Sequence, residues 1–288
     1  MIRPEIHEAN RLSWNSATVV HNSRKPDQAG FLRDGGTTLF EEEIALLGDV
    51  HGQEVLHLLC NSGQDTLGIA ALGARVTGVD ISDEAIAFAR ALSEDSGIPA
   101  TFERSDVYPW LEQAIADGKR YDTVFVSYGA LCWLSDLDEW MRLAGAVLKP
   151  GGRFVCMEFH PVAMIFDEKG AHAFHYSQPH EPLTWDDGVS DYVGASSGGL
   201  VPSGKVEAAL PFKNPNPCHE FLRGTGDILG AVLGAGLVLR SFREYFHSNG
   251  WKPYEEMSPL PGRRWTVADG KPRIPLMYSI VAEKRATP

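Results

Sequence analysis

Three short polar segments carry the residues whose types and spacing could do chemistry. They comprise Cys60, Asn61, Ser62, Gly63, Gln64 and Asp65, then Asp80 and Ile81, then Ser105, Asp106 and Val107. The Asp80 carboxylate can accept hydrogen bonds from both hydroxyls of a ribose, and the Asp106 carboxylate with a backbone N–H suits the edge of an adenine ring. Each segment alone could be a plain connector or a solvated strand end. Together they predict an adenosine site.

Each of these segments follows an apolar run that is typical of a buried strand, and helical patterns alternate with the runs. The predicted strands are Glu54–Cys60, Arg75–Asp80, Thr101–Arg104, Tyr121–Ser127, Arg153–Phe159, Leu237–Phe246 and Ile274–Glu283. This alternation predicts an α/β fold, with a Rossmann-like, seven-stranded, mostly parallel sheet and helices on both faces. Ligands of such sheets bind beyond the carboxyl ends of the strands, where the three polar segments lie.

The remaining segments predict covers around one elaborated domain that spans residues 1–288. We expect an N-terminal helical cover over 1–48, a cofactor-binding core over 49–160 and a loop-like cap insertion over 161–215. Residues 216–288 then complete the sheet, with a helix over Glu220–Leu233 and a lid loop over 249–272.

Composition excludes several classes of protein. Hydrophobic residues make up 43% and charged residues 22% of the 288 residues, which is ordinary for a globular chain. The net charge of −12 argues against a nucleic-acid partner. The four cysteines form no CxxC pair, and neither a signal peptide nor a membrane-spanning apolar run is apparent. We therefore expect a cytoplasmic protein without a membrane partner, whose oligomeric state the sequence does not indicate.

The first turn lacks the fingerprint of a dinucleotide site. That fingerprint is G-x-G-x-x-G, and the corresponding positions here hold Leu59, Asn61 and Gln64. A bulky Leu59 argues against a diphosphate, and a Walker sequence is absent.

The stretch from Glu54 to Phe159 resembles the core of the class I S-adenosylmethionine-dependent methyltransferases. The motifs that carry the resemblance are Val55-Leu-His-Leu-Leu-Cys-Asn-Ser-Gly63, Val76-Thr-Gly-Val-Asp80-Ile-Ser, Ser105-Asp106-Val107 and Val147-Leu-Lys-Pro-Gly-Gly152-Arg-Phe. The chain departs from the family at His57, Leu59 and Asn61, where Asp, Gly and Gly are usual. The Asn-Ser-Gly-Gln version of the first motif resembles a bacterial subgroup that acts on small molecules.

The resemblance implies S-adenosylmethionine as cofactor and S-adenosylhomocysteine as product. Asp80 would then bind the ribose, Asp106 and Val107 the adenine, and residues 60–65 the methionine portion, with Ser127 at the end of the fourth strand. After that strand the chain reads Ser127-Tyr128-Gly129-Ala130 rather than the Asn/Asp-Pro-Pro-Tyr of enzymes that methylate nucleobases. The implied reaction is in-line methyl transfer to a nitrogen or oxygen of a small molecule, by an enzyme.

Several residues could accept a proton from the acceptor. His160 follows the fifth strand and is our first candidate for a general base, with His219, Glu220 and Tyr128 next. His160 could equally have a structural role before Pro161. Six aromatic residues could close over a flat substrate: Trp133, Tyr176, Trp185, Trp251, Tyr254 and Trp265.

Three alternatives stay open. Arg263 and Arg264 could grip a carboxylate or form a solvated pair. The histidine-rich stretch over 158–181 offers a His172-x-x-His175 pair, but its loop-like pattern fixes no ligand geometry, and we assign no metal. The adenosine site could also belong to a nucleotide-binding oxidoreductase or to a non-catalytic cofactor-binding module.

Overall fold

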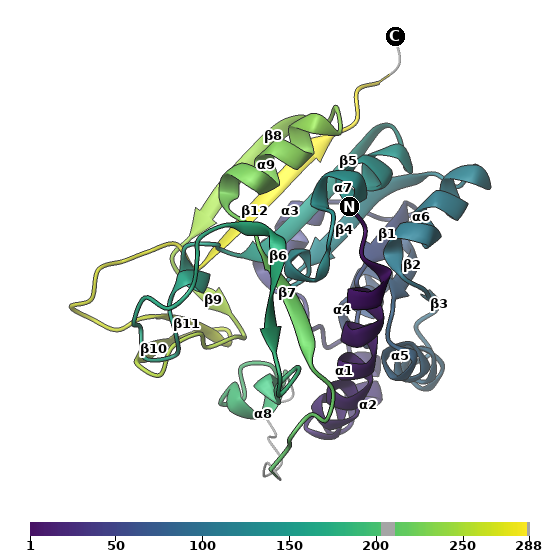
Figure 1. The fold of residues 1–288 in the computed structure, drawn as a ribbon. Helices are drawn as coiled ribbons and strands as arrows, with labels where there is room; N and C mark the ends of the chain where they lie inside the picture. Colours follow the sequence, from purple (N-terminus) through teal and green to yellow (C-terminus); the bar gives the residue numbers. More distant parts are fainter. Residues whose placement is uncertain (203–210, 287–288) are drawn as a thin grey trace.

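A seven-stranded sheet with the strand order β3-β2-β1-β4-β5-β12-β8 forms the centre of the computed structural model, which describes residues 1–202 and 211–286 (Figure 1). Its strands are β1 (Glu54–Leu58), β2 (Arg75–Asp80), β3 (Thr101–Arg104), β4 (Tyr121–Ser127), β5 (Leu148–Phe159), β8 (Val238–Tyr245) and β12 (Met277–Glu283). Neighbouring strands from β3 through β5 are parallel, and β12 runs antiparallel to both β5 and β8. The predicted α/β fold class is confirmed.

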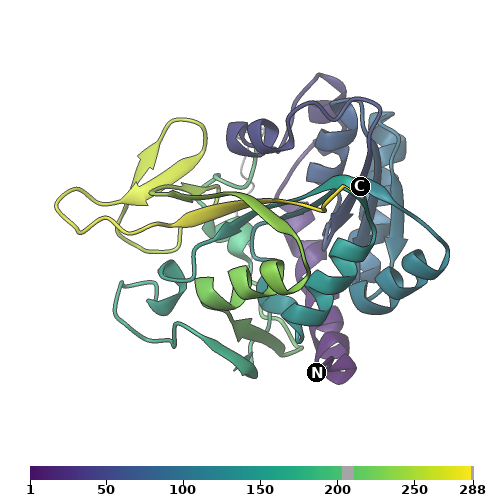
Figure 2. The ribbon, with the colours of Figure 1, turned by 90° about the horizontal axis from the view of Figure 1, so that it is seen from above.

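Helices cover both faces of the sheet because the connections on either side of β1 leave on opposite faces (Figure 2). One face carries α3 (Glu41–Leu47), α4 (Gln64–Ala71) and α5 (Asp83–Ser96), and the other carries α6 (Val107–Ala116), α7 (Leu137–Ala146) and α9 (Thr225–Gly234). Alternate residues of β1 show the division. Val55 packs with Phe125 and Val155 on the first face, whereas Leu56 packs on the second, where Trp140 is fully buried.

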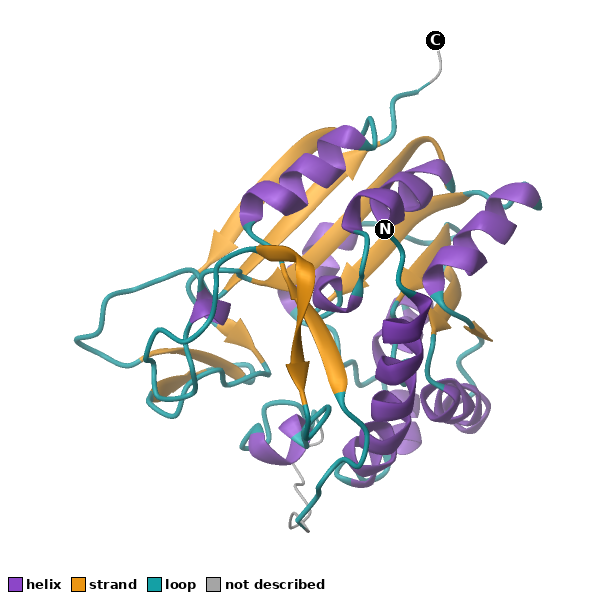
Figure 3. Cartoon of the chain, viewed as in Figure 1, coloured by secondary structure: helices purple, strands orange, loops and turns teal. Residues whose placement is uncertain are grey.

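The remaining elements gather beyond the carboxyl ends of the parallel strands (Figure 3). They are α1 (Pro4–Ser23), α2 (Gln28–Arg33), η1 (Leu131–Trp133), η2 (Ala163–Ile165), β6 (Gln178–Trp185), α8 (Tyr192–Ala195), β7 (Cys218–Leu222), β9 (Ser248–Asn249), β10 (Met257–Leu260) and β11 (Arg264–Val267). β6 and β7 form an antiparallel pair, and β9, β10 and β11 form a three-stranded sheet. α1 packs against α5 and β7.

Three expectations for these covers were wrong in part. The helix predicted over Glu220–Leu233 begins at Thr225, because residues 218–222 pair with β6 as a strand and Gly224 precedes the first helical turn. The segment 161–215 contains η2, β6 and α8 rather than a loop alone, and the lid over 249–272 contains β10 and β11. Each of these short strands pairs with a partner that its own local pattern does not reveal.

A helix that crosses a bilayer must have about 20 predominantly apolar residues. Within residues 1–202 and 211–286, no helix is both long and apolar enough to cross a bilayer.

Two buried histidines should make the stability of the fold depend on pH. His21 lies 4.2 Å from the Tyr192 ring, with Nε2 2.8 Å from the Ser190 carbonyl oxygen, and His57 places Nδ1 2.8 Å from the Thr66 hydroxyl. Burial lowers the pKa of each imidazole to about 4. In the unfolded chain the pKa is about 6.5, so the unfolded state binds the additional protons between pH 6.5 and 4.

The free energy of unfolding should therefore fall as the pH is lowered from 6.5 to 4, by up to roughly 1.4 kcal/mol per pH unit for each histidine. Denaturant unfolding of the wild type, His21→Gln, His57→Gln and the double variant across this range measures the slope. Each single variant should flatten the slope by about half of what the double variant does. A wild-type slope in the double variant would contradict the assignment.

Candidate active site

A cavity of about 890 Å³ opens at the carboxyl ends of β1, β2, β3 and β4. Its floor is formed by Leu59, Cys60, Asn61, Gln64, Asp65, Asp80, Ile81, Asp106, Val107 and Ser127. Its walls come from α1, η1, β7, the segment 184–202 and the residues around Asn249 and Arg263. Nine of these ten floor residues were proposed from sequence as cofactor contacts, and Tyr128, a proposed base, lines the same cavity. Ser62, Gly63 and Ser105 are not among the described residues that line it.

The turn after β1 holds an unusual backbone. Leu59, Asn61 and Gly63 all have positive φ, at 54°, 47° and 75°. A Cβ on Gly63 would lie 2.6 Å from the Phe102 ring and 2.7 Å from Ala89, so packing as well as conformation requires glycine here. At Leu59 a branched side chain occupies a left-handed conformation that disfavours it, which is the kind of backbone strain that accompanies binding sites.

The Asp80 carboxylate faces the cavity from the end of β2. Its Oδ2 accepts a hydrogen bond from the Asn61 backbone N–H at 2.8 Å, and its Oδ1 accepts one from Ser82 at 2.9 Å. Burial raises the pKa of this carboxyl group, against the effect of the backbone donors. Each oxygen retains a lone pair, so the group is fixed in place and still able to accept hydrogen bonds from a ligand.

Asp106 is held from two sides. Its Oδ1 accepts from the Tyr108 N–H at 3.1 Å, which caps α6, and its Oδ2 lies 2.6 Å from His7 Nδ1. The His7 ring stacks on Tyr108 with centroids 5.2 Å apart, and its Nε2 lies 2.7 Å from the Ser135 hydroxyl. Ser105 turns its hydroxyl to the Asp106 carbonyl. His7 was not anticipated, because its neighbours lie 99 and 128 residues away along the chain.

Two cations line the same cavity near Asp65. Burial lowers the pKa of Lys25 to about 8, an effect that the Asp65 carboxylate opposes. Arg263 lies 4.3 Å above the Phe40 ring and donates to the carbonyls of Gly199 and Thr38, each at 3.2 Å. Arg263 is thus a cavity residue rather than half of a solvated pair.

Its neighbour Arg264 belongs to a network that ties the lid to α3. The Arg264 guanidinium donates to Glu42 at 2.9 Å, and His247 Nε2 lies 3.0 Å from the same carboxylate. Burial would raise the pKa of Glu42, but these two hydrogen bonds hold it at about 2. Asn249 donates both to Glu42, at 3.3 Å, and to the Tyr128 hydroxyl, at 2.8 Å, so the network reaches the cavity wall.

A buried carboxylate shapes the loop after β4. Glu158 accepts hydrogen bonds from the backbone N–H groups of Gly129, Ala130 at 2.8 Å, Leu131 at 3.2 Å and Phe159 at 2.9 Å. The loop turns sharply, since Tyr128 and Gly129 have φ of 39° and 69°. This arrangement brings the Tyr128 side chain and η1 to the cavity.

The four predicted bases are placed differently. Tyr128 lines the cavity, but burial and the nearby Glu43 charge raise its pKa well above the usual range, so the phenol keeps its proton. His160 and His219 are not among the described residues that line the cavity. His160 Nδ1 accepts from the Val162 N–H at 3.1 Å, and its Nε2 lies 3.0 Å from the Glu244 carboxylate.

His219 lies on β7, where alternate side chains point in opposite directions. Its Nδ1 is 2.9 Å from the Thr184 hydroxyl, while Cys218 and Glu220 point into the cavity. The sequence proposed His219 and Glu220 together as bases. The alternation of side chains along β7 places Glu220, and not His219, in the cavity.

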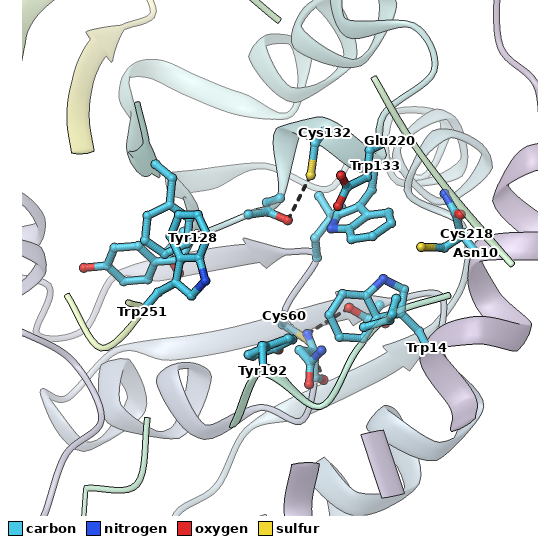
Figure 4. Close-up of a pocket in the computed structure, with 18 of the residues that line it drawn as sticks. Asn10, Trp14, Cys60, Tyr128, Cys132, Trp133, Tyr192, Cys218, Glu220 and Trp251 are labelled. Carbon is cyan, nitrogen blue, oxygen red and sulfur yellow. Dashed lines mark hydrogen bonds between the residues drawn. The ribbon is translucent and has the colours of Figure 1, made fainter. Parts of the chain in front are cut away.

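Glu220 lines a part of the cavity that carries aromatic side chains, here called the aromatic chamber (Figure 4). The rings of Trp14 and Trp133 meet edge to face with centroids 5.4 Å apart, and the Trp185 indole donates to Glu220 Oε2 at 2.9 Å. Trp251 lines another part of the wall and packs on Phe159 at 4.5 Å. Of the six aromatic residues proposed as covers, Trp133, Trp185 and Trp251 reach the cavity, whereas Tyr176, Tyr254 and Trp265 do not line its described part.

A bound metal ion in a protein is usually held by three or more His, Cys, Asp or Glu side chains. In residues 1–202 and 211–286, no group of three or more His, Cys, Asp and Glu side chains is arranged to hold a metal ion.

Comparison with known proteins agrees with this geometry. Residues 55–152 match the family model described as a methyltransferase domain. The ubiquinone biosynthesis O-methyltransferase of Methylobacterium sp. (strain 4-46) is 32% identical over 144 residues, which cover 49% of this chain and 55% of the relative. The chain thus spans about half the length of that relative.

Solved structures share the fold. An S-adenosylmethionine-dependent methyltransferase from Mesorhizobium loti is 20% identical, with a TM-score of 0.53 over 86% of this chain and 99% of the other. The [4+2]-cyclase SpnF is 13% identical, with a TM-score of 0.55 over 98% and 97% of the two chains. At these identities the likeness concerns the fold. Residues 55–152 therefore match a methyltransferase domain, and the chain shares its fold with solved S-adenosylmethionine-dependent methyltransferases.

Proposed function

We propose that this chain transfers the methyl group of S-adenosylmethionine to an oxygen or nitrogen of a small aromatic molecule. The observation that carries the proposal is a single cavity in which the adenosine-type residues and an aromatic chamber adjoin. Ligand sites commonly measure about 300–1,000 Å³, so a cavity of about 890 Å³ has room for an acceptor beside the cofactor. The quinone-related name of the Methylobacterium relative supports an aromatic acceptor and methylation at oxygen.

The residues of the cavity floor fit the chemical groups of the cofactor. We assign Asp80 to the ribose hydroxyls, and Asp106 and Val107 to the adenine edge, with His7 holding Asp106 in position. Lys25 and Arg263 supply positive charge for the methionine carboxylate, and Asp65 lies close enough to receive its ammonium group.

When bound, the cofactor supplies a methyl group that is attached to a sulfonium sulfur. The leaving group of the transfer is the neutral thioether. The chain's own contribution is to align the acceptor, exclude water and hold the proton that the acceptor loses. The aromatic walls around Trp14 and Trp133 serve the first two tasks.

A second function remains to be tested against the first. The same fold occurs in a protein named as a [4+2]-cyclase, so the fold alone does not establish methyl transfer. A nucleotide-binding oxidoreductase is a further alternative, although the Leu59 side chain stands where a pyrophosphate needs close approach to the backbone.

Ligand-dependent thermal unfolding should separate these functions. S-adenosylhomocysteine should raise the melting temperature of the chain, and NAD should leave it unchanged, because the cavity floor offers carboxylates and no diphosphate cradle. Incubation with S-adenosylmethionine and metabolite extracts, followed by mass spectrometry, should then reveal an acceptor that has gained one methyl group. Stabilisation by NAD without stabilisation by S-adenosylhomocysteine would overturn the proposal.

The role of Asp80 can be isolated with a matched substitution. Asp80→Asn should weaken S-adenosylhomocysteine binding about ten- to hundredfold in calorimetric titration, since a charge-assisted hydrogen-bond acceptor is lost. Asp122→Asn is the control. The Asp122 carboxylate also accepts a hydrogen bond from a backbone N–H group, that of Glu54 at 2.8 Å. It lies near the start of β4, at the opposite ends of the strands from the cavity. Equal affinities in Asp80→Asn and the control would remove Asp80 from the site.

A further inference from the structure

Glu220 stands out among the cavity residues because its carboxylate has one hydrogen-bond donor among the described residues. That donor is the Trp185 indole, which binds Oε2 at 2.9 Å. The other oxygen, Oε1, is left free to accept a hydrogen bond. Burial raises the pKa of the carboxyl group, an effect that the Trp185 hydrogen bond opposes. Such a carboxylate is a stronger proton acceptor than an exposed one.

The neighbours of Glu220 offer no competing base. Burial and the Glu220 charge raise the pKa of Cys132 and of Cys218, so both thiols stay protonated. The Asn10 amide is engaged with the backbone of His219, donating at 2.9 Å and accepting at 2.7 Å. At this end of the cavity Glu220 is therefore the group that can take a proton at neutral pH.

Several other titratable residues of the cavity are engaged away from Glu220. Asp80 and Asp106 receive backbone N–H groups at the floor, and Tyr128 keeps its proton. His57 faces the cavity, but burial holds its pKa at about 4 and its Nδ1 is paired with Thr66. Asp186 and Asp187 line the cavity from the exposed segment after β6.

The chamber around Glu220 suits a flat molecule. Trp14 from α1 and Trp133 from η1 form its apolar walls, and η1 packs directly against β7, the strand that carries Glu220 (Figure 4). Aromatic faces of this kind bind planar rings by stacking and edge contacts. The single free oxygen of Glu220 matches a hydroxyl, which has one donor, better than an ammonium group, which has three.

We propose that Glu220 binds the hydroxyl group of a planar aromatic acceptor held against the paired rings of Trp14 and Trp133 and accepts its proton during methyl transfer. The assignment rests on the proposed function. As the hydroxyl oxygen forms its bond to the methyl carbon, the carbon–sulfur bond breaks with its electron pair remaining on sulfur, and the hydroxyl proton passes to Glu220 Oε1. Charge and atoms balance, and no further reactant is required.

Binding of simple probes tests the assignment without cofactor. We use 2-naphthol, 2-methoxynaphthalene and 2-naphthylmethylamine in calorimetric titrations of the wild type and Glu220→Gln. The amide keeps the shape of the side chain and its bond to Trp185 but carries no charge. The affinity for 2-naphthol should rise from pH 5 to pH 8 in the wild type as Glu220 ionises, and Glu220→Gln should lower it about tenfold at pH 8 and abolish the pH dependence. The methoxy probe should bind both forms equally.

Two controls keep the outcomes separate. Glu181→Gln changes an exposed carboxylate on the partner strand β6 and should leave all three probes unaffected. S-adenosylhomocysteine should stabilise Glu220→Gln as much as the wild type, and turnover with an identified aromatic acceptor should fall about a hundredfold or more with loss of the acidic limb of the pH profile.

The possible results differ in meaning. Failure of S-adenosylhomocysteine to stabilise the wild type would overturn the proposed function. Stabilisation with naphthol binding that is equal in the wild type and Glu220→Gln would overturn the role of Glu220 alone. The amine probe could also bind the wild type more tightly than the naphthol does, and lose this preference in Glu220→Gln. That result would indicate an amine in place of the hydroxyl as the group bound by Glu220 and would also overturn the assignment.

Discussion

The reversal of strand order at β1 is the constraint on which the site depends. β1 lies between β2 and β4, so the helices that follow it and those that follow β4 cover opposite faces of the sheet. The carboxyl ends of the strands at this point are left without a covering helix, and ligands of open sheets bind there for that reason. In this chain α1, β7 and the segment 184–202 cover the ends and turn a crevice into a cavity.

Carboxylates at the cavity floor and beneath the loop after β4 are fixed by backbone donors. Asp80 takes two backbone N–H groups and Glu158 takes four, so the turns after β1 and β4 are held by carboxylates that lie on neighbouring strands. A preorganised site spends less of the ligand's binding energy on ordering its own groups. The Glu158 carboxylate thus fixes the shape of the loop that carries Tyr128 and leads into η1. Glu158 itself does not line the cavity.

The sequence predicted the sheet and the cavity floor well, because both depend on local patterns. Apolar runs that end in Asp80 or Asp106 mark strand ends whatever the rest of the chain does. The walls depend instead on contacts between distant segments. His7 and Trp14 read as an ordinary helix, and nothing near them in sequence points to Asp106 or Trp133. The choice between His219 and Glu220 required the pairing of β7 with β6, which a helical interpretation of that segment concealed.

The position of α1 has a consequence for how the chain is made. This helix is synthesised before the sheet, yet its residues contact Val189, Asn214 and His219, which emerge from the ribosome some two hundred residues later. The contacts between α1 and β7 can therefore form only after β7 has been synthesised, at a cost in chain entropy. Until then the floor of the site lies open while the sheet core assembles. The wall that would enclose the acceptor accordingly forms only after the residues of the floor have been synthesised.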